Sequence, residues 1–220
     1  MTSRGFRIRV LKRAKKADVQ IAIPVLDQLE AYYRLLARWN DKINLTALPL
    51  RELTDPAVDR LLIEPLAAAR YVPEAPITWF DLGSGGGSPA LPLKAVRPAA
   101  HLTLVESKAR KAAFLREAVR SLSLSDTVVE TVRFEEFAQR SVVKAAAQLV
   151  TVRAVKLDKA FFDAARALIA PQGQLLLFSS YESPGKAPSG FEVSQVVRLS
   201  PTARNIGALP SSQLVILKRT

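Results

Sequence analysis

The amino-acid sequence predicts an α/β fold, in which a mostly parallel, twisted β-sheet carries helices on both faces. Three observations support this. After residue 76, short apolar runs alternate with longer amphipathic stretches, which is the pattern of parallel strands joined by crossover helices. A glycine-rich segment directly follows the first of these runs. The chain has 220 residues, of which 49% are hydrophobic, so it can bury a large core without disulfides or metals.

The part of the chain before residue 76 predicts a small helical unit. In residues 24–39, apolar side chains recur at every third or fourth position, as on one face of an amphipathic helix. A second helical stretch, roughly residues 56–71, follows a turn near residue 45. We therefore expect three parts: a basic N-terminal tail at residues 1–17, a helical unit at 18–74 and a ligand-binding α/β domain at 75–220.

The elements of the α/β domain follow from the alternation of apolar runs. Strands are predicted at residues 77–82, 102–106, 127–132, 149–152 and 175–178, and helices at residues 89–96, 108–122, 135–147 and 158–170. Two further apolar runs, at residues 191–197 and 213–217, have no helix between them. We expect these two runs to close the sheet as a hairpin-like pair.

The composition excludes several classes of protein. The chain has no cysteine, which rules out disulfides, thiolate metal sites and cysteine nucleophiles. Its single histidine, His101, begins a predicted strand at the end away from the glycine-rich segment, so we expect it on the surface. A Ser-His-Asp triad or a histidine metal cluster cannot be built, and we expect no metal. No apolar run reaches the roughly 18 residues that a membrane span needs.

Positive charge is concentrated at the N-terminus. The formal net charge is +12, and the first sixteen residues hold seven cations and no acid: Arg4, Arg7, Arg9, Lys12, Arg13, Lys15 and Lys16. Three interpretations remain open for this segment: an organelle-targeting peptide, a solvated tail, or a contact with nucleic acid that gains affinity by releasing phosphate counterions. Charge alone does not decide among them, nor does it decide whether the segment is ordered.

The glycine-rich segment, residues 81–88, directly precedes a predicted helix, and this is where open α/β sheets bind their ligands. A dinucleotide pattern, G-x-G-x-x-G/A, is met only when it is read from Gly85 to Ala90, and a lone match of this kind is weak. The acidic-x-G-x-G-x-G pattern of S-adenosylmethionine (SAM) enzymes is met at every position, by Asp81, Gly83, Gly85 and Gly87. The segment therefore favours SAM, with the leading carboxylate near the methionine ammonium group.

Glu106 ends the second predicted strand, at the same edge of the sheet as the glycine-rich segment. A carboxylate at this position can accept two hydrogen bonds from a ribose diol. The alternative is an acid at a strand end that pairs with Lys108 or Arg110.

Several motifs agree with one known family. They are Trp39-Asn40, Asn44-Leu45-Thr46-Ala47, the loop from Asp81 to Pro92, Val96-Arg97-Pro98, Phe114-Leu115-Arg116, Arg133 with Glu135-Glu136-Phe137, and Arg153-Ala154. In these motifs the chain resembles the small-subunit (16S) ribosomal RNA methyltransferases called RsmG or GidB. The resemblance runs from about residue 20 to the C-terminus. It implies a Rossmann-like SAM-dependent methyltransferase fold, with residues 75–220 as the SAM-binding methyltransferase domain.

The resemblance also implies a function. Members of the family transfer a methyl group from SAM to N7 of a guanine in 16S ribosomal RNA, so the expected partner is 16S rRNA or the small ribosomal subunit. We expect a cytoplasmic protein, monomeric and without a membrane contact. Cations that could contact RNA phosphates are the N-terminal cluster and Arg60, Lys108, Arg110, Lys111, Arg116 and Arg204.

The expected site combines the glycine-rich segment with positions carried over from the family. Its cofactor-binding residues are Asp81, Gly83, Gly85, Gly87, Ser88, Glu106, Phe134, Glu135 and Arg153. Guanine N7 has a free lone pair, so methyl transfer to it needs no general base, and we assign no catalytic residue. Arg153 is a candidate for positioning the substrate base. The alternative for Arg153 is a structural ion pair with a neighbouring acid.

The chain departs from the family at several positions. Leu61 and Pro65 stand where the family has histidine and serine, Ser179 stands where it has lysine, and Ser88 stands where an aliphatic residue is usual. Three other functions remain open. They are a SAM-dependent methyltransferase of a small molecule or a protein, a catalytically silent RNA-binding factor associated with the ribosome, and a nicotinamide-dependent oxidoreductase that uses the Gly85 pattern.

Overall fold

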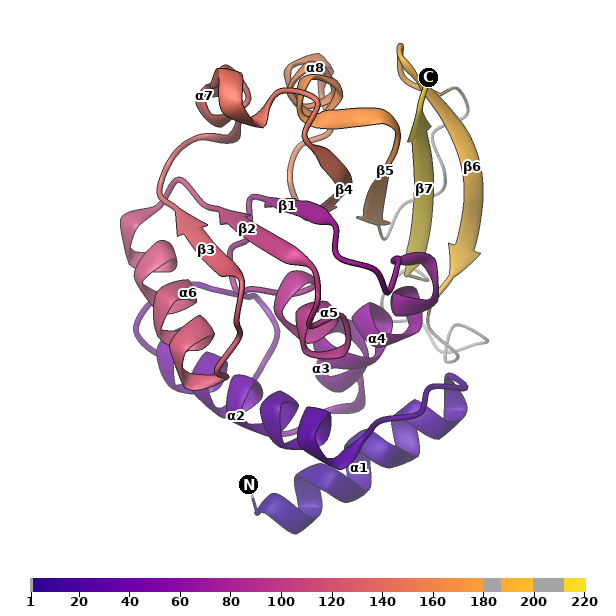
Figure 1. Ribbon diagram of the computed structural model, residues 1–220. Helices are drawn as coiled ribbons and strands as arrows, with labels where there is room; N and C mark the ends of the chain where they lie inside the picture. Colours follow the sequence, from indigo (N-terminus) through magenta and orange to yellow (C-terminus); the bar gives the residue numbers. More distant parts are fainter. Residues whose placement is uncertain (1, 180–186, 200–211) are drawn as a thin grey trace.

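The computed structural model describes residues 2–179, 187–199 and 212–220, and Arg204 lies outside them. Its centre is a seven-stranded sheet with the order β3-β2-β1-β4-β5-β7-β6 (Figure 1). The strands are β1 (Thr78–Leu82), β2 (His101–Val105), β3 (Thr127–Glu130), β4 (Ala147–Arg153), β5 (Ile169–Ser179), β6 (Phe191–Arg198) and β7 (Gln213–Arg219). The first five strands are parallel, and β7 pairs antiparallel with both β5 and β6. The α/β class and the antiparallel pair at the end of the chain are thereby confirmed.

Helices cover both faces of the sheet. On one face, α5 (Ala90–Val96) and α6 (Ala109–Ser121) share a hydrophobic cluster with the N-terminal helices and with inward side chains such as Trp79 and Leu104. On the other face, α7 (Phe134–Phe137) and α8 (Lys159–Leu168) pack with Phe80 and its neighbours in a second cluster (Figure 1). Adjacent strand residues such as Trp79 and Phe80 belong to different clusters because successive side chains point to opposite faces of a sheet.

The predicted helical unit consists of α2 (Ile23–Asn40) and a continuous helical stretch over residues 55–71. This stretch contains α3 (Asp55–Val58), a π-helical turn η1 (Asp59–Ile63), α4 (Glu64–Ala68) and a 3₁₀ turn η2 (Ala69–Tyr71). Asn40 ends α2, and its side-chain Oδ1 accepts hydrogen bonds from the backbone N–H groups of Leu45 and Thr46, both at 2.9 Å. These bonds fold residues 40–46 back towards the sheet.

Residues 3–16, which we expected as part of a basic tail, form helix α1 (Ser3–Lys16). The Thr2 side chain caps its N-terminus by accepting a hydrogen bond from the Gly5 N–H at 3.2 Å. Phe6, Val10 and Ala14 recur at four-residue spacing and are buried. Because these three side chains have an apolar surface to pack on, the basic segment is stable as a helix.

Two boundaries were predicted wrongly. The helix expected at residues 135–147 is only α7 (Phe134–Phe137) and a 3₁₀ turn at Ser141–Val143. Val142 is 84% exposed, so the segment has no buried stripe that could sustain a longer helix. The helix expected to end at residue 170 ends at Leu168, because β5 begins at Ile169 and continues through the Pro-Gln-Gly segment at 171–173 with a shift in register.

Candidate functional site

The carboxyl ends of three adjacent strands bring the predicted site residues together. Asp81 lies in β1, Glu106 directly follows β2, and Arg153 ends β4. Because β1 lies between β2 and β4 and all three strands are parallel, the glycine-rich segment leaves the sheet between Glu106 and Arg153. His101 begins β2 at the opposite end, and 61% of its side chain is exposed, which confirms the prediction that it is a surface residue.

The backbone of the glycine-rich segment needs glycine at two of its positions. Gly83 has a φ of +70° and Gly87 a φ of +85°, in the left-handed region that other residues rarely adopt. A Cβ on Gly83 would lie 2.5 Å from Val155 Cγ2, and one on Gly87 would lie 2.4 Å from Leu91 Cδ1. The tight turn therefore brings backbone, rather than side chains, to the end of β1.

Asp81 is buried below this turn. Only 1% of its surface is exposed, and its Oδ1 accepts a hydrogen bond of 2.5 Å from Thr151 Oγ1. Thr151 Oγ1 in turn accepts a bond of 2.9 Å from the indole N–H of Trp79. Burial raises the pKa of Asp81 to about 6, against the opposing effect of the Thr151 hydrogen bond. Asp81 therefore changes charge close to neutral pH.

Glu106 is held by backbone groups. Its Oε2 accepts a hydrogen bond from the Gly85 N–H at 2.9 Å, and its Oε1 accepts one from the Lys108 N–H at 2.8 Å. The carboxylate is thus tied to the glycine-rich segment on one side and to the start of α6 on the other. These bonds use backbone N–H groups, whereas the alternative interpretation expected an ion pair with the side chain of Lys108 or Arg110.

Arg153 forms an ion pair with Glu64, as the alternative interpretation of Arg153 predicted. Its Nη2 donates to Glu64 Oε2 at 2.9 Å, and only 8% of the Arg153 side chain and 4% of the Glu64 side chain are exposed. Its Nη1 donates to the backbone oxygen of Arg60 and to Ser88 Oγ, the latter at 3.2 Å. Burial lowers the pKa of Arg153 to about 10 and raises that of Glu64. The guanidinium group therefore has a fixed position beside the glycine-rich segment.

Ser88 and Leu61, two positions at which the chain departs from the family, take part in the hydrogen bonds around Arg153. Ser88 Oγ donates a hydrogen bond to the backbone oxygen of Leu61 at 3.0 Å while it accepts the one from Arg153. An aliphatic residue at position 88 could make neither bond. Ser88 thereby joins the glycine-rich segment to the π-helical turn η1.

A pocket of about 490 Å³ opens next to Arg153, at the carboxyl ends of β4 and β5. It is lined by Arg60, Val152, Ala154, Val155, Lys156, Leu157, Leu177, Phe178 and Ser179. The Phe178 ring faces the Arg153 guanidinium, with the guanidinium carbon 4.7 Å from the ring centroid. Arg60 is half-buried, and its Nη1 lies 3.8 Å from Glu64 Oε2. The pocket lining is mostly apolar and includes two cations, Arg60 and Lys156, which suits a planar heterocycle.

Phe134 and Glu135 lie on α7, just beyond the carboxyl end of β3. The Phe134 ring packs at 5.8 Å from the ring of Phe161. One carboxylate oxygen of Glu135 accepts a hydrogen bond from Arg133 at 3.1 Å, and the other is buried without a partner. A buried oxygen of this kind can accept a hydrogen bond from a ligand.

Sequence reasoning missed three residues of the site: Tyr32, Glu64 and Thr151. The Tyr32 hydroxyl donates to the backbone oxygen of Gly86 at 2.6 Å and so ties α2 to the glycine-rich segment. The helical spacing assigned Tyr32 only to a core face. For Glu64 a signal was present, because it lies among the residues that depart from the family, beside Leu61 and Pro65.

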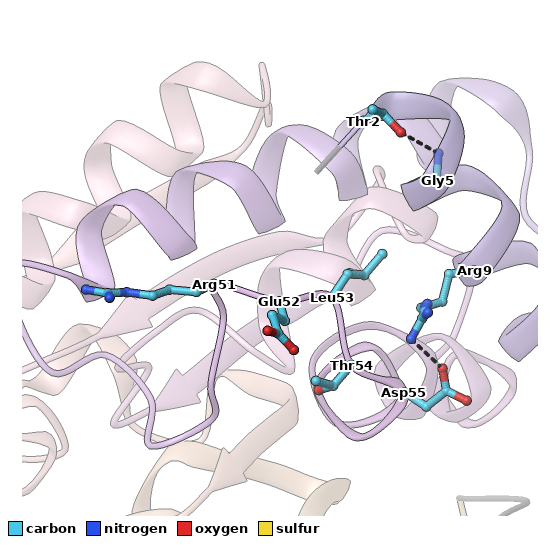
Figure 2. Close-up of a pocket in the computed structure, with 8 residues that line it drawn as sticks. All are labelled: Thr2, Gly5, Arg9, Arg51, Glu52, Leu53, Thr54 and Asp55. Atoms are coloured by element: carbon cyan, nitrogen blue, oxygen red, sulfur yellow. Dashed lines mark hydrogen bonds and ion pairs between the residues drawn. The ribbon is translucent and has the colours of Figure 1, made fainter.

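A second pocket, of about 550 Å³, lies between the start of α1 and residues 51–55 (Figure 2). In it, Arg9 donates to Asp55 Oδ1 at 3.2 Å, and Thr2 accepts the capping bond from Gly5 (Figure 2). None of the predicted site residues lines this pocket. In the part of the chain that the structure describes, no group of three or more metal-ligating side chains occurs, and no helix is long and apolar enough to cross a membrane.

Comparison with known proteins gives a consistent result. Residues 25–186 match the family model of the rRNA small subunit methyltransferase G. The chain is 35% identical over 188 residues to the ribosomal RNA small subunit methyltransferase G of Xanthomonas axonopodis pv. citri, covering 84% of this chain and 82% of that protein. It is 34% identical over 164 residues to the protein of the same name from Halorhodospira halophila, covering 74% of each.

Solved structures are similar in fold. TrmN from Thermus thermophilus has a TM-score of 0.53 at 16% identity, covering 71% of this chain and 49% of that one. TYW2 of P. horikoshii, solved in complex with MeSAdo, has a TM-score of 0.54 at 14% identity, covering 70% of this chain and 61% of that one. At these identities the likeness concerns the fold alone.

Proposed function

The chain belongs to the rRNA small subunit methyltransferase G family, and from this membership we propose that it transfers a methyl group from SAM to N7 of a guanine in 16S ribosomal RNA. The observation that carries the proposal is the arrangement of Asp81, the glycine-rich segment and Glu106 at the ends of two adjacent strands. The partner is 16S rRNA, free or in the small subunit. We further propose that the protein acts as a monomer in the cytoplasm, with residues 75–220 as its SAM-binding domain.

The residues present fit SAM. We propose that the nine predicted contacts hold it: Asp81, Gly83, Gly85, Gly87, Ser88, Glu106, Phe134, Glu135 and Arg153. Asp81 would face the ammonium group, Glu106 would accept from the ribose diol, and the unpartnered oxygen of Glu135 would accept from the adenine amino group. The backbone turn between these side chains depends on glycine, because Val155 packs against Gly83 and Leu91 packs against Gly87 too closely for a Cβ.

The pattern of charge disfavours the dinucleotide alternative. The Gly85 N–H, which a pyrophosphate would use, already donates to Glu106. Asp81 borders the glycine-rich segment, and its carboxylate repels a phosphate while it attracts an ammonium group, whereas a carboxylate in the place of Glu106 suits the ribose of either cofactor.

SAM, when bound, supplies an electrophilic methyl group on a sulfonium sulfur. Guanine N7 attacks through a lone pair that is already free, so no protein group has to remove a proton. The remaining task is orientation, which can account for a large share of a barrier reduction. We propose that the guanine enters the pocket at the ends of β4 and β5, next to the guanidinium group of Arg153, which Glu64 and the Phe178 ring hold in place.

The test is transfer of labelled methyl from SAM to small ribosomal subunits, and to their naked RNA, from cells that lack this protein. We expect label in the RNA, released on hydrolysis as N7-methylguanine. An Asp81→Ala variant should lose both SAM binding and transfer. SAM binding by the wild-type protein without label in either RNA would contradict the proposed substrate. It would also direct attention to the changes at Leu61 and Ser179.

A further inference from the structure

Helix α1 lies outside residues 25–186, the part of the chain that matches the family model, yet it is firmly attached to the fold. Phe6, Val10 and Ala14 are buried in the same hydrophobic cluster as α2 and the sheet. The Phe6 ring lies 5.8 Å from the ring of Tyr33. The helix therefore has one orientation relative to the rest of the molecule.

Three of the seven N-terminal cations serve this attachment. Arg7 pairs with Asp27 on α2, and Arg9 pairs with Asp55 at 3.2 Å. Arg13, only 1% exposed, donates two hydrogen bonds to the carboxylate of Asp59 in η1. Acids of the helical unit thus neutralise the cations on the inner side of α1.

The opposite side of α1 carries cations that no acid neutralises. We call the outer face of α1 the five exposed residues Arg4, Ile8, Leu11, Lys12 and Lys15. Their spacing of three, four or one residues sets them on one side of the helix. Helix α1 contains no acidic residue, and among the described residues no acid lies within ion-pair distance of the three cations of the outer face.

We propose that the outer face of α1 binds the phosphodiester backbone of RNA and adds affinity for the substrate to that of the catalytic domain. The identity of the RNA rests on the proposed function. Cations without acidic neighbours, fixed on a rigid helix, gain affinity by releasing the counterions of phosphates. Helix α1 is anchored to η1 through Arg13 and Asp59, and the next residue of η1, Arg60, lines the pocket beside Arg153, so one extended RNA can contact both places.

An anionic membrane is a poorer partner for this face. A helix that lies in a bilayer surface inserts a broad apolar side, usually with aromatic residues. In α1 that side is Phe6, Val10 and Ala14, and it is already buried against the protein. Only Ile8 and Leu11, 58% and 45% exposed, are apolar on the outer face; they are neighbours at a spacing of three, and two side chains are too narrow a patch for such insertion.

The test compares two variants of the full chain that lose the same charge. In one, Arg4, Lys12 and Lys15 are changed to Gln. In the matched control, three exposed residues are changed to Gln. Lys159 and Arg166 lie on α8, at the other end of the molecule from α1 (Figure 1). Lys144 precedes Ala145, whose N–H donates to the backbone oxygen of Ala167 in α8. Binding to 16S rRNA is measured from low to high salt, with SAM binding and the unfolding midpoint as checks on folding.

We expect the outer-face variant to lose about 10- to 100-fold in RNA affinity at low salt, and its slope of log K against log salt to fall by about 2, since each phosphate contact contributes roughly 0.7 to 0.9. The control should change little, and both variants should bind SAM as the wild type does. Equal RNA binding by the two variants would overturn the inference. Binding to anionic phospholipid vesicles is measured in parallel, and an outer-face variant that loses only this binding would also overturn it. If the outer face governs RNA binding but the wild type transfers no methyl group, the inference stands and the proposed function fails.

Discussion

At the scale of single residues, the buried pair of Arg153 and Glu64 decides how the site is held. A charged group removed from water is costly unless its partner and hydrogen bonds remain. Arg153 has Glu64, Ser88 and the backbone oxygen of Arg60 around it. The pair therefore fixes a cation beside the glycine-rich segment. The loss of either partner alone should lower the stability of the protein strongly.

Changing Glu64 alone should destabilise the protein. In Glu64→Leu the buried guanidinium group loses its carboxylate, and we expect a loss of about 3 to 5 kcal/mol in the free energy of unfolding. Adding Arg153→Met removes the unpaired charge, so the double variant should recover part of this loss. Urea unfolding measures both. A double variant as unstable as the sum of the single variants would show that the pair is not the source of the effect.

The raised pKa of Asp81 gives the site a pH dependence. The charged carboxylate is the form that attracts the SAM ammonium group, so SAM affinity should rise as the pH rises through about 6. At pH 5 only about one Asp81 in ten is ionised, and the apparent affinity should be about tenfold weaker than at pH 8. Equilibrium dialysis with labelled SAM measures this, and Asp81→Asn should bind weakly at every pH.

The stability of the free protein should depend on pH in the opposite direction. Folding raises the pKa of Asp81 above its ordinary value of 3.8, so the native state favours the protonated form. This contribution to stability is present below pH 4 and is lost as the pH rises through about 6. In Asp81→Asn that part of the pH dependence should be absent. For the binding prediction, a wild-type SAM affinity that does not change between pH 5 and 8 would contradict the proposed contact of Asp81 with the ammonium group.

At the scale of elements, the turn between β1 and α5 depends on where glycine is required. Gly87→Ala combines a φ of +85° with a Cβ 2.4 Å from Leu91, on the helix that follows. We expect it to cost about 2 kcal/mol or more in stability and to abolish SAM binding. In the control, Gly85→Ala, the new Cβ meets nothing closer than 3.7 Å, so only the strain of its φ of +51° remains, about 1 kcal/mol. The unfolding midpoint and the SAM affinity are measured for both variants. Equal losses in Gly87→Ala and Gly85→Ala would be evidence against the predicted clash with Leu91.

Most of the elements could be predicted from local pattern. The strands β1 to β4 and the helices α2, α5 and α6 have the apolar periodicity that the fold requires, and the glycine-rich segment follows β1 as expected. The helix predicted at 135–147 was wrong because no residue of 139–146 is buried and Val142 is 84% exposed, which periodicity cannot detect. The pairing of Arg153 with Glu64 joins residues 89 positions apart, and local pattern carries no information about such contacts.

At the scale of the whole molecule, one hydrophobic cluster joins parts that the sequence divided. It extends from Phe6 through α2 and the helical stretch at 55–71 to Trp79 in β1 and Ile216 in β7. Tyr32 adds a hydrogen bond from α2 to the glycine-rich segment. The division of the chain at residues 17 and 74 stays a prediction, and the packing favours a single cooperative unit.

The chain's two tryptophans can test this unity, because Trp39 lies in α2 of the helical unit and Trp79 lies in β1 of the sheet. We expect their fluorescence, followed separately in Trp79→Phe and Trp39→Phe, to report the same unfolding midpoint within each protein as circular dichroism does. SAM at about 100 times its dissociation constant should stabilise the native state by about 2.7 kcal/mol. Both fluorescence signals should then move to higher temperature by the same amount, although SAM is proposed to contact only residues after 80. If the helical unit were an independent domain, the Trp39 signal would melt in its own transition and would not respond to SAM. The hydrogen bond from Tyr32 to Gly86 would then be too weak to couple the two parts.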